Sequence, residues 1–192
     1  MQIGIPAETL AGETRVAATP ETVKKFAALG CEVIVQAGAG LASSATDAAY
    51  EAAGAKVVAT AAEALANADF VLKVAAPTAD EVTLMKQGAT VFAAFAPHQN
   101  PHFDAYAAKG LTCVAMELIP RITRAQSSDI LSSQANLAGY KAVMIAADRY
   151  QRIFPMLMTA AGTVKAARVV ILGVGVAGLQ AIATAKRLGA VI

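Results

Sequence analysis

One stretch near the end of the chain constrains the fold more than any other. It reads RVVILGVGVAG over residues 168–178 and is followed by a helix-like segment, Leu179–Leu188, that Gly189 closes. In such a pattern the first glycine permits a tight turn, the second lets phosphates approach the backbone, and the third lets helix and strand pack closely. We therefore expect a strand at Val169–Leu172, a turn, and a helix whose free N–H groups bind an anion.

The same pattern predicts a dinucleotide without choosing between NAD and NADP. An acidic residue about 20 positions after the first glycines binds the ribose hydroxyl in NAD sites, and here that position falls beyond Ile192. The alternative is an ordinary strand–turn–helix whose glycines serve packing alone.

Strand-like and helix-like segments alternate through the first 115 or so residues, which predicts a parallel sheet covered by helices. The expected strands are Gln2–Ile5, Cys31–Gln36, Lys56–Val58, Phe70–Lys73, Thr90–Phe95 and Thr112–Met116. The expected helices are Pro20–Leu29, Thr46–Ala53, Ala61–Ala66, Ala79–Met85 and His102–Lys109.

The regular alternation lapses near Pro120, and a long helix is expected at 129–150 with Ser128 as its cap. Its apolar stripe would be Leu137, Tyr140, Met144 and Ala147. We therefore expect an α/β fold with two Rossmann-like lobes and parallel sheets, the second lobe truncated. The expected divisions are an N-terminal lobe at 1–128, the inter-lobe helix at 129–150 and the start of a second lobe at 151–192.

Composition excludes several classes of protein. The net charge is +2 and there is no Trp, so the basic face with aromatic platforms that nucleic-acid binding needs is not expected. Cys31 and Cys113 are too few for a disulfide framework, and the glycine-interrupted apolar stretches are too short to span a membrane. No signal peptide is recognised at the start, and no side-chain set has metal-ligand spacing. These features predict a cytoplasmic protein without a metal.

A second dense cluster, PRITRAQSSDILSSQAN over residues 120–136, lies where two lobes would meet. Arg121 and Asp129 are close enough in sequence to pair across a loop, and Gln126 offers a carboxamide to a ligand's carboxamide. The alternative is a solvated loop followed by helix-capping residues.

The opening motifs GIPxE from Gly4, ExRVAxTP from Glu13 and GAG from Gly38 resemble the alanine dehydrogenase and nicotinamide nucleotide transhydrogenase superfamily. The hinge motif RITRAQSxDxLSSQANxxGY narrows the resemblance to the NAD(H)-binding alpha subunits (domain I) of proton-translocating NAD(P) transhydrogenases. The resemblance implies that Arg121, Gln126 and Asp129 position the nicotinamide, with no acid or base role. It implies that the cofactor is bound by Arg121, Ile122, Thr123, Arg124, Gln126, Asp129, Ser132, Gly173, Gly175, Val176 and Gly178.

The same resemblance implies a homodimeric component that binds NAD and passes hydride to NADP on a partner component. That transfer would be coupled to proton movement through a membrane domain, with this component peripheral at the cytoplasmic face of the inner membrane. Because the family's NAD-binding component is longer, this chain alone is expected to be inactive.

Two other functions stay open. In alanine dehydrogenase, Arg15 and Lys73 would match residues that hold the substrate's carboxylate and carbonyl, although His98 does not lie in the motif expected for the catalytic histidine. Alternatively, the chain is a non-catalytic binding or assembly module.

Overall fold

The structure, a computed structural model, describes residues 1–192, which form two compact units, Met1–Ile119 and Pro120–Ile192. The lobe divisions expected at 128 and 150 stay a prediction.

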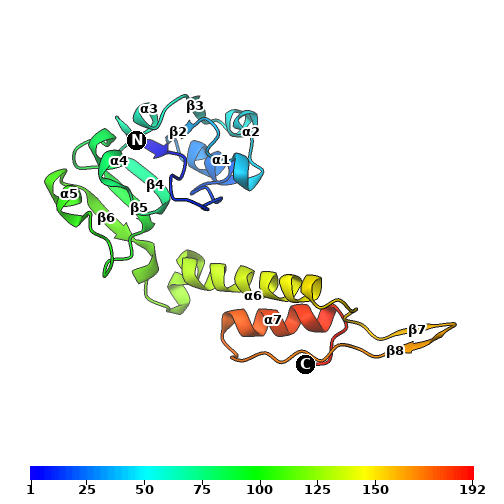
Figure 1. The fold of residues 1–192 in the computed structure, drawn as a ribbon. Coiled ribbons are helices and arrows are strands. Elements are labelled where there is room, and N and C mark those ends of the chain that lie inside the picture. The colour runs from blue at the N-terminus through cyan, green and yellow to red at the C-terminus, as the bar shows by residue number, and fades with distance from the viewer. The chain divides into compact units, whose positions relative to one another are not determined.

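The first unit is built on a six-stranded sheet of order β3-β2-β1-β4-β5-β6 in which every neighbouring pair is parallel (Figure 1). The sheet predicted from the alternating segments is confirmed, with ends that shift by at most two residues. Its strands are β1 (Gln2–Ile5), β2 (Glu32–Gln36), β3 (Lys56–Val58), β4 (Phe70–Ala75), β5 (Thr90–Ala94) and β6 (Thr112–Ala115). The helices are α1 (Pro20–Ala28), α2 (Asp47–Ala52), α3 (Ala61–Leu65), α4 (Ala79–Leu84) and α5 (Phe103–Ala108), with short 3₁₀ turns η1 (Leu41–Ser43) and η2 (Met116–Leu118).

Apolar side chains cover both faces of this sheet, because successive residues of a strand point to opposite sides. Ile3 and Ile5 of β1 join one buried cluster with Val23 of α1 and Tyr50 of α2. The other cluster is formed by Leu65, Val71, Val82, Val91, Phe95 and Tyr106, from β4, β5 and the helices α3, α4 and α5. A sheet with helices packed on both faces is the Rossmann-like arrangement.

Threonines cap the first four helices of this unit, α1 to α4. Thr19 caps α1, with Pro20 in its first turn as predicted. Thr60 and Thr78 start α3 and α4 with complete capping boxes, in which Glu63 and Glu81 bond back to the cap backbone. Side-chain oxygens thus satisfy N–H groups that a helix start leaves free.

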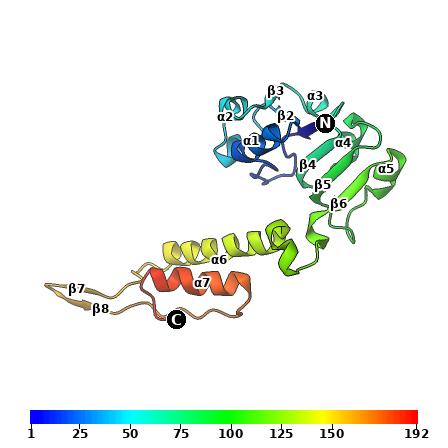
Figure 2. The ribbon, with the colours of Figure 1, turned by 180° about the vertical axis from the view of Figure 1, so that it is seen from behind.

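The second unit consists of a 3₁₀ turn η3 (Thr123–Ser128), the long helix α6 (Ile130–Arg149), a hairpin of β7 (Leu157–Thr159) and β8 (Gly162–Val164), and helix α7 (Val176–Arg187). Figures 1 and 2 both show α6 and α7 side by side. Asp129 caps α6 by accepting from the backbone N–H of Ser132, so the expected cap at Ser128 is wrong.

The apolar stripe predicted on α6 is only half right. Met144 and Ala147 pack against the buried cluster, but Leu137 is 61% and Tyr140 49% exposed. The buried positions of the helix are Gly139 and Val143. Gly139 meets the backbone of α7 at Ala177, and Val143 shares a buried apolar cluster with Ala181 and Ala185 of α7.

The strand predicted at Val169–Leu172 is also corrected. The segment pairs with the rest of the chain only through a parallel bridge between Arg168 and Val191. Val170 is 83% and Leu172 95% exposed, whereas Val169 and Ile171 pack on the buried cluster. The residues keep strand-like alternation but lack the neighbouring strand that a ladder needs. In the second unit, therefore, no parallel sheet forms, and the exposed antiparallel hairpin is an element the sequence did not predict.

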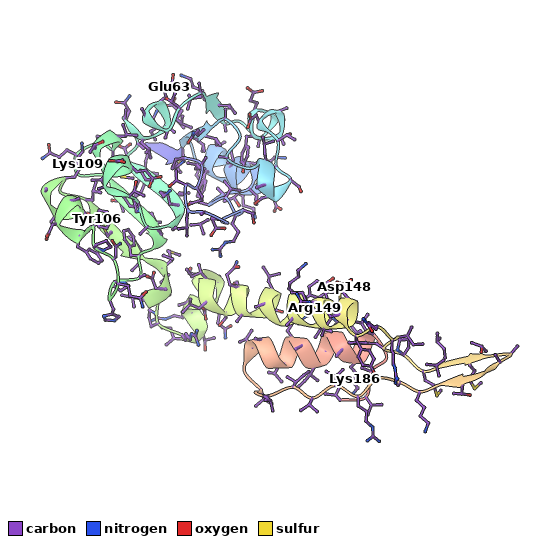
Figure 3. The ribbon with its side chains drawn as sticks, viewed as in Figure 1. Glu63, Tyr106, Lys109, Asp148, Arg149 and Lys186 are labelled. Carbon is purple, nitrogen blue, oxygen red and sulfur yellow. The ribbon has the colours of Figure 1, made fainter.

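Charge is divided unequally between the units. The first contains seven Lys and Arg against twelve Asp and Glu, and the second contains nine against two, giving formal charges of −5 and +7. No acidic residue follows Asp148, and the basic residues of the second unit include Arg149 at the end of α6 and Lys186 near the end of α7 (Figure 3). No helix combines the length and apolar character required to cross a bilayer.

Candidate functional site

Three glycines shape the turn before α7, each for a different reason. Gly173 has φ +108°, a conformation that favours glycine. A Cβ on Gly175 would meet nothing within 4 Å, so this residue faces open space. A Cβ on Gly178 would overlap the carbonyl oxygen of Gly173 and lie 2.7 Å from its carbon, so close packing requires glycine there.

The start of α7 is open to a ligand. Gly175 is the N-cap residue and offers no side-chain hydrogen bond to the helix. The first N–H groups of a helix have no partner within it and carry the positive end of its dipole. The turn therefore presents free donors beside a glycine that leaves room for an anion.

A cavity of about 330 Å³ lies at this turn, entirely within the second unit. Its lining comprises Arg121, Ser132, Ala135, Leu172, Gly173, Gly175, Val176, Ala177 and Gly178. The structure thus brings together six of the residues named from the sequence, two from the hinge motif and four from the glycine turn. The other five, Ile122, Thr123, Arg124, Gln126 and Asp129, do not line the cavity.

Asp129 holds the start of α6 and the arginine of the hinge. Its carboxylate accepts from the backbone N–H of Ser132 at 2.9 Å and from the Ser132 hydroxyl at 2.7 Å. These hydrogen bonds, with a smaller contribution from Arg121, lower the pKa of Asp129. The Arg121 Nε lies 3.8 Å from the Asp129 Oδ2. Asp129 therefore stays ionised and keeps Arg121 at the cavity edge.

The remaining hinge residues lie on or beside η3 and are exposed. Ile122 is its N-cap residue, and Thr123, Arg124 and Gln126 belong to the turn. Gln126 makes no side-chain hydrogen bond within the chain, so its carboxamide is free to bind a ligand.

In the first unit, the position where the sheet topology would favour a ligand is occupied by the chain's own charged side chains. The sheet order reverses between β1 and β4, the place where open α/β sheets bind ligands. Here the Glu8 carboxylate accepts from the backbone N–H groups of Val74 at 2.5 Å and Ala75 at 3.3 Å. Lys73 Nζ lies 3.3 Å from Glu8 and 2.8 Å from Glu81. No more than 8% of any of these three charged side chains is exposed.

Arg15 and Lys73, which would hold a substrate in an alanine dehydrogenase, are therefore both paired with carboxylates of this chain. Lys73 is buried between the carboxylates of Glu8 and Glu81. Arg15 donates two side-chain hydrogen bonds to Glu13, at 2.8 and 2.7 Å, and the bond to Arg15 lowers the pKa of Glu13 to about 2. His98 lies exposed in the turn after β5. No group of three or more His, Cys, Asp or Glu side chains is placed to hold a metal ion.

Sequence reasoning missed three lining residues: Ala135, Leu172 and Ala177. Ala135 lies three positions after Ser132 on α6, so helical spacing could have placed it on the same face. Leu172 and Ala177 flank the glycine turn, but their apolar character suggested a buried role.

A doubly covered parallel sheet, together with a glycine turn that opens α7, defines the class of Rossmann-like α/β proteins. Residues 4–138 match the family described as "Alanine dehydrogenase/PNT, N-terminal domain", and residues 142–192 match "Alanine dehydrogenase/PNT, C-terminal domain". The chain belongs to the alanine dehydrogenase/PNT family.

Individual relatives agree with this membership and with the α/β fold class. The chain is 57% identical to an NAD(P) transhydrogenase subunit alpha of Rhodospirillum rubrum, over all of this chain and 52% of that protein. The crystal structure of transhydrogenase from Sinorhizobium meliloti matches with a TM-score of 0.94 and 55% identity, over 99% of this chain and 55% of that one. A structure of L-alanine dehydrogenase matches with a TM-score of 0.83 and 30% identity, over 99% and 53% of the two chains. The chain spans about half the length of these relatives.

Proposed function

We propose that this chain is the NAD(H)-binding component of a proton-translocating NAD(P) transhydrogenase. The observation that carries the proposal is the cavity in which Arg121 and Ser132 of the hinge motif meet the glycine turn. The higher identity to a transhydrogenase alpha subunit than to the alanine dehydrogenases, 57% against 35% and 36%, supports this activity over theirs.

In the proposed binding mode, the pyrophosphate lies against Gly175 and the free N–H groups at the start of α7. Gly173, Val176 and Gly178 shape that wall. Open space beside Gly175 and the lack of a capping side chain on α7 both fit a bound diphosphate.

The nicotinamide end would lie toward the hinge. Arg121 and Gln126 contact it, Ile122, Thr123 and Arg124 lie alongside, and Asp129 with Ser132 fixes the position of Arg121. NAD supplies the hydride chemistry when it is bound. The chain's residues act by holding the ring in place, because direct hydride transfer needs no general acid or base.

The partner would be an NADP-binding component, together with a membrane domain that couples transfer to proton movement. With these partners, the chain would lie at the cytoplasmic face of the inner membrane. We also propose a homodimer, which the hairpin β7–β8 supports. An isolated two-stranded hairpin is at best marginally stable in water, and Leu157 and Met158 of β7 are 45% and 79% exposed.

The occupied state of Arg15 and Lys73 argues against the alanine dehydrogenase alternative. A keto-acid carboxylate would have to displace Glu13 from Arg15, and a carbonyl would have to reach a lysine buried between Glu8 and Glu81.

The test joins this chain to the C-terminal half of the Rhodospirillum rubrum relative and adds an NADP-binding transhydrogenase component. We expect NADH-dependent reduction of an NADP analogue. Oxidation of NADH that depends on pyruvate and ammonium would contradict the proposal, and binding without any transfer would indicate the non-catalytic module.

Gln126→Ala tests the hinge within the same assay. We expect it to slow hydride transfer about 100-fold while weakening NADH binding much less, because misplacing the ring costs rate more than affinity. Gln134→Ala, on the exposed part of α6, is the matched control and should transfer hydride at the unmodified rate. Unchanged turnover in Gln126→Ala would remove this residue from the site.

A further inference from the structure

Helices α6 and α7 touch backbone to backbone at Gly139. A Cβ added to Gly139 would overlap the carbonyl oxygen of Ala177 and lie 2.9 Å from its carbonyl carbon and 3.0 Å from its Cα. These are backbone atoms, which cannot rotate aside as the end of a side chain can. The separation of the two helices at this point therefore depends on glycine.

The face of α6 that makes this contact also lines the cavity. Ser132, Ala135 and Gly139 are spaced by three and four residues, which places them along one side of the helix. Ser132 and Ala135 form the α6 wall, and Ala177 belongs to the opposite wall. The distance held at Gly139 therefore sets the distance between the two walls one turn away.

The opposite wall of the cavity, formed by the glycine turn, is held in a fixed position relative to Ala177. The next residue, Gly178, packs directly on the carbonyl of Gly173, so the first turn of α7 and the glycine turn are held together. A displacement of α6 away from Ala177 would thus move Ser132 and Ala135 relative to the whole phosphate-binding turn.

We propose that Gly139 is a positioning residue that sets the width of the dinucleotide site. The inference rests on the proposed function, because it assumes a ligand that reaches both walls. A methyl group at this position moves α6 outward. NADH then cannot contact the glycine turn and the hinge side at once, whereas a ligand that needs only the turn is unaffected.

The experiment compares NADH with ADP-ribose, which lacks the nicotinamide, by NMR titration of the chain joined to the C-terminal half of the Rhodospirillum rubrum relative. In Gly139→Ala we expect the affinity for NADH to fall about tenfold, the loss of roughly one charged hydrogen bond, and the affinity for ADP-ribose to change less than about twofold. Ala142→Ser adds one heavy atom to an exposed position of the same helix and should change neither affinity.

The ratio of the two affinities separates positioning from simple stability. A purely structural role would lower the midpoint of thermal unfolding and leave the NADH to ADP-ribose ratio unchanged, which would overturn the proposal. Failure of the joined protein without substitutions to bind either ligand would instead overturn the proposed function.

A second variant tests the same wall if Gly139→Ala fails to fold. Ala135→Gly removes a methyl group from the α6 wall without touching the contact at Gly139. We expect it to lower the affinity for NADH about threefold and to leave the affinity for ADP-ribose unchanged, because a wall contact of roughly one methyl group is lost. Equal effects on both ligands, or none, would show that α6 is not a wall of the site.

Discussion

Each unit has backbone N–H groups suited to bind an anion, and the two units differ in what occupies the place beside these groups. In the first, Glu8 occupies the backbone N–H groups at the end of β4, and Lys73 neutralises it. In the second, Gly175 leaves the N–H groups at the start of α7 open. Free backbone N–H groups are thus part of a buried charged cluster in one unit and of a candidate binding site in the other. In the first unit, a carboxylate of the chain itself accepts from the backbone N–H groups. In the second, an anionic group of the ligand would accept from them.

The largest effect that would sharpen this contrast is expected from Lys73→Met. The change leaves Glu8 and Glu81 buried without their cation, which should lower the free energy of unfolding by about 3–5 kcal/mol. Denaturant titration measures it, and Lys86→Met is the control because its pair with Asp69 is exposed. A loss below about 1 kcal/mol, as at a surface pair, would mean that the buried charged cluster contributes little.

The glycine turn offers a matched pair of substitutions. Gly178→Ala forces a methyl group against the carbonyl of Gly173 and should cost about 1–3 kcal/mol, the range for overpacking. Gly175→Ala points into open space, so it should cost at most about 1 kcal/mol, the difference between glycine and alanine as a helix N-cap. It should lower NADH affinity about tenfold or more, because the methyl group occupies the place proposed for the phosphate. Thermal unfolding and NADH titration separate the two. Unchanged NADH affinity in Gly175→Ala would place the anion elsewhere.

A smaller effect is expected from Asp129→Ala, which removes the cap of α6. Losing such a cap costs about 1 kcal/mol, and freeing Arg121 should also weaken NADH binding. Ser133→Ala, whose hydroxyl bonds only to the Asp129 carbonyl, is the control. Retention of NADH affinity in Asp129→Ala would show that Arg121 does not need this carboxylate.

The smallest effect concerns the first unit at low pH. Because the pKa of Glu13 is lowered from 4.5 to about 2, its contribution to stability is complete above pH 4.5 and disappears as the pH falls toward 2. Glu13→Gln should therefore flatten the stability profile in this window and leave NADH binding at neutral pH unchanged. Parallel profiles of the two proteins between pH 4.5 and 2 would contradict the assignment.

The regularly alternating region of the fold could be predicted from the sequence, because strand residues such as Ile3 and Val33 are buried by neighbours that the same pattern supplies. The extended segment at Val169–Leu172 could not be placed in a sheet correctly, since ladder formation depends on a neighbouring strand and not on local propensity. The prediction of the apolar stripe on α6 was partly wrong for a related reason. Apolar spacing predicts which side chains are buried, but it cannot identify Gly139, which contacts α7 because it has no side chain.

For the site, motif chemistry named the glycines and Arg121, but it could not show which hinge residues line the cavity. Gln126 and Asp129 are only a few positions from Ser132, yet the turn η3 directs them away from the lining. The buried centre around Lys73 was missed because Glu8 is far from Lys73 and Glu81 in sequence and meets them only once β1 and β4 pair.

The unequal charge of the units has a consequence for rates. The net charge of +2 suggests little attraction for an anion, but a dinucleotide that approaches the second unit meets a local formal charge of +7. Such a field raises the association rate constant of an anionic ligand and acts over the Debye length, which shrinks from about 30 Å at 0.01 M salt to about 10 Å at 0.1 M. Capture of the dinucleotide should therefore slow as salt is added, while its dissociation rate changes little.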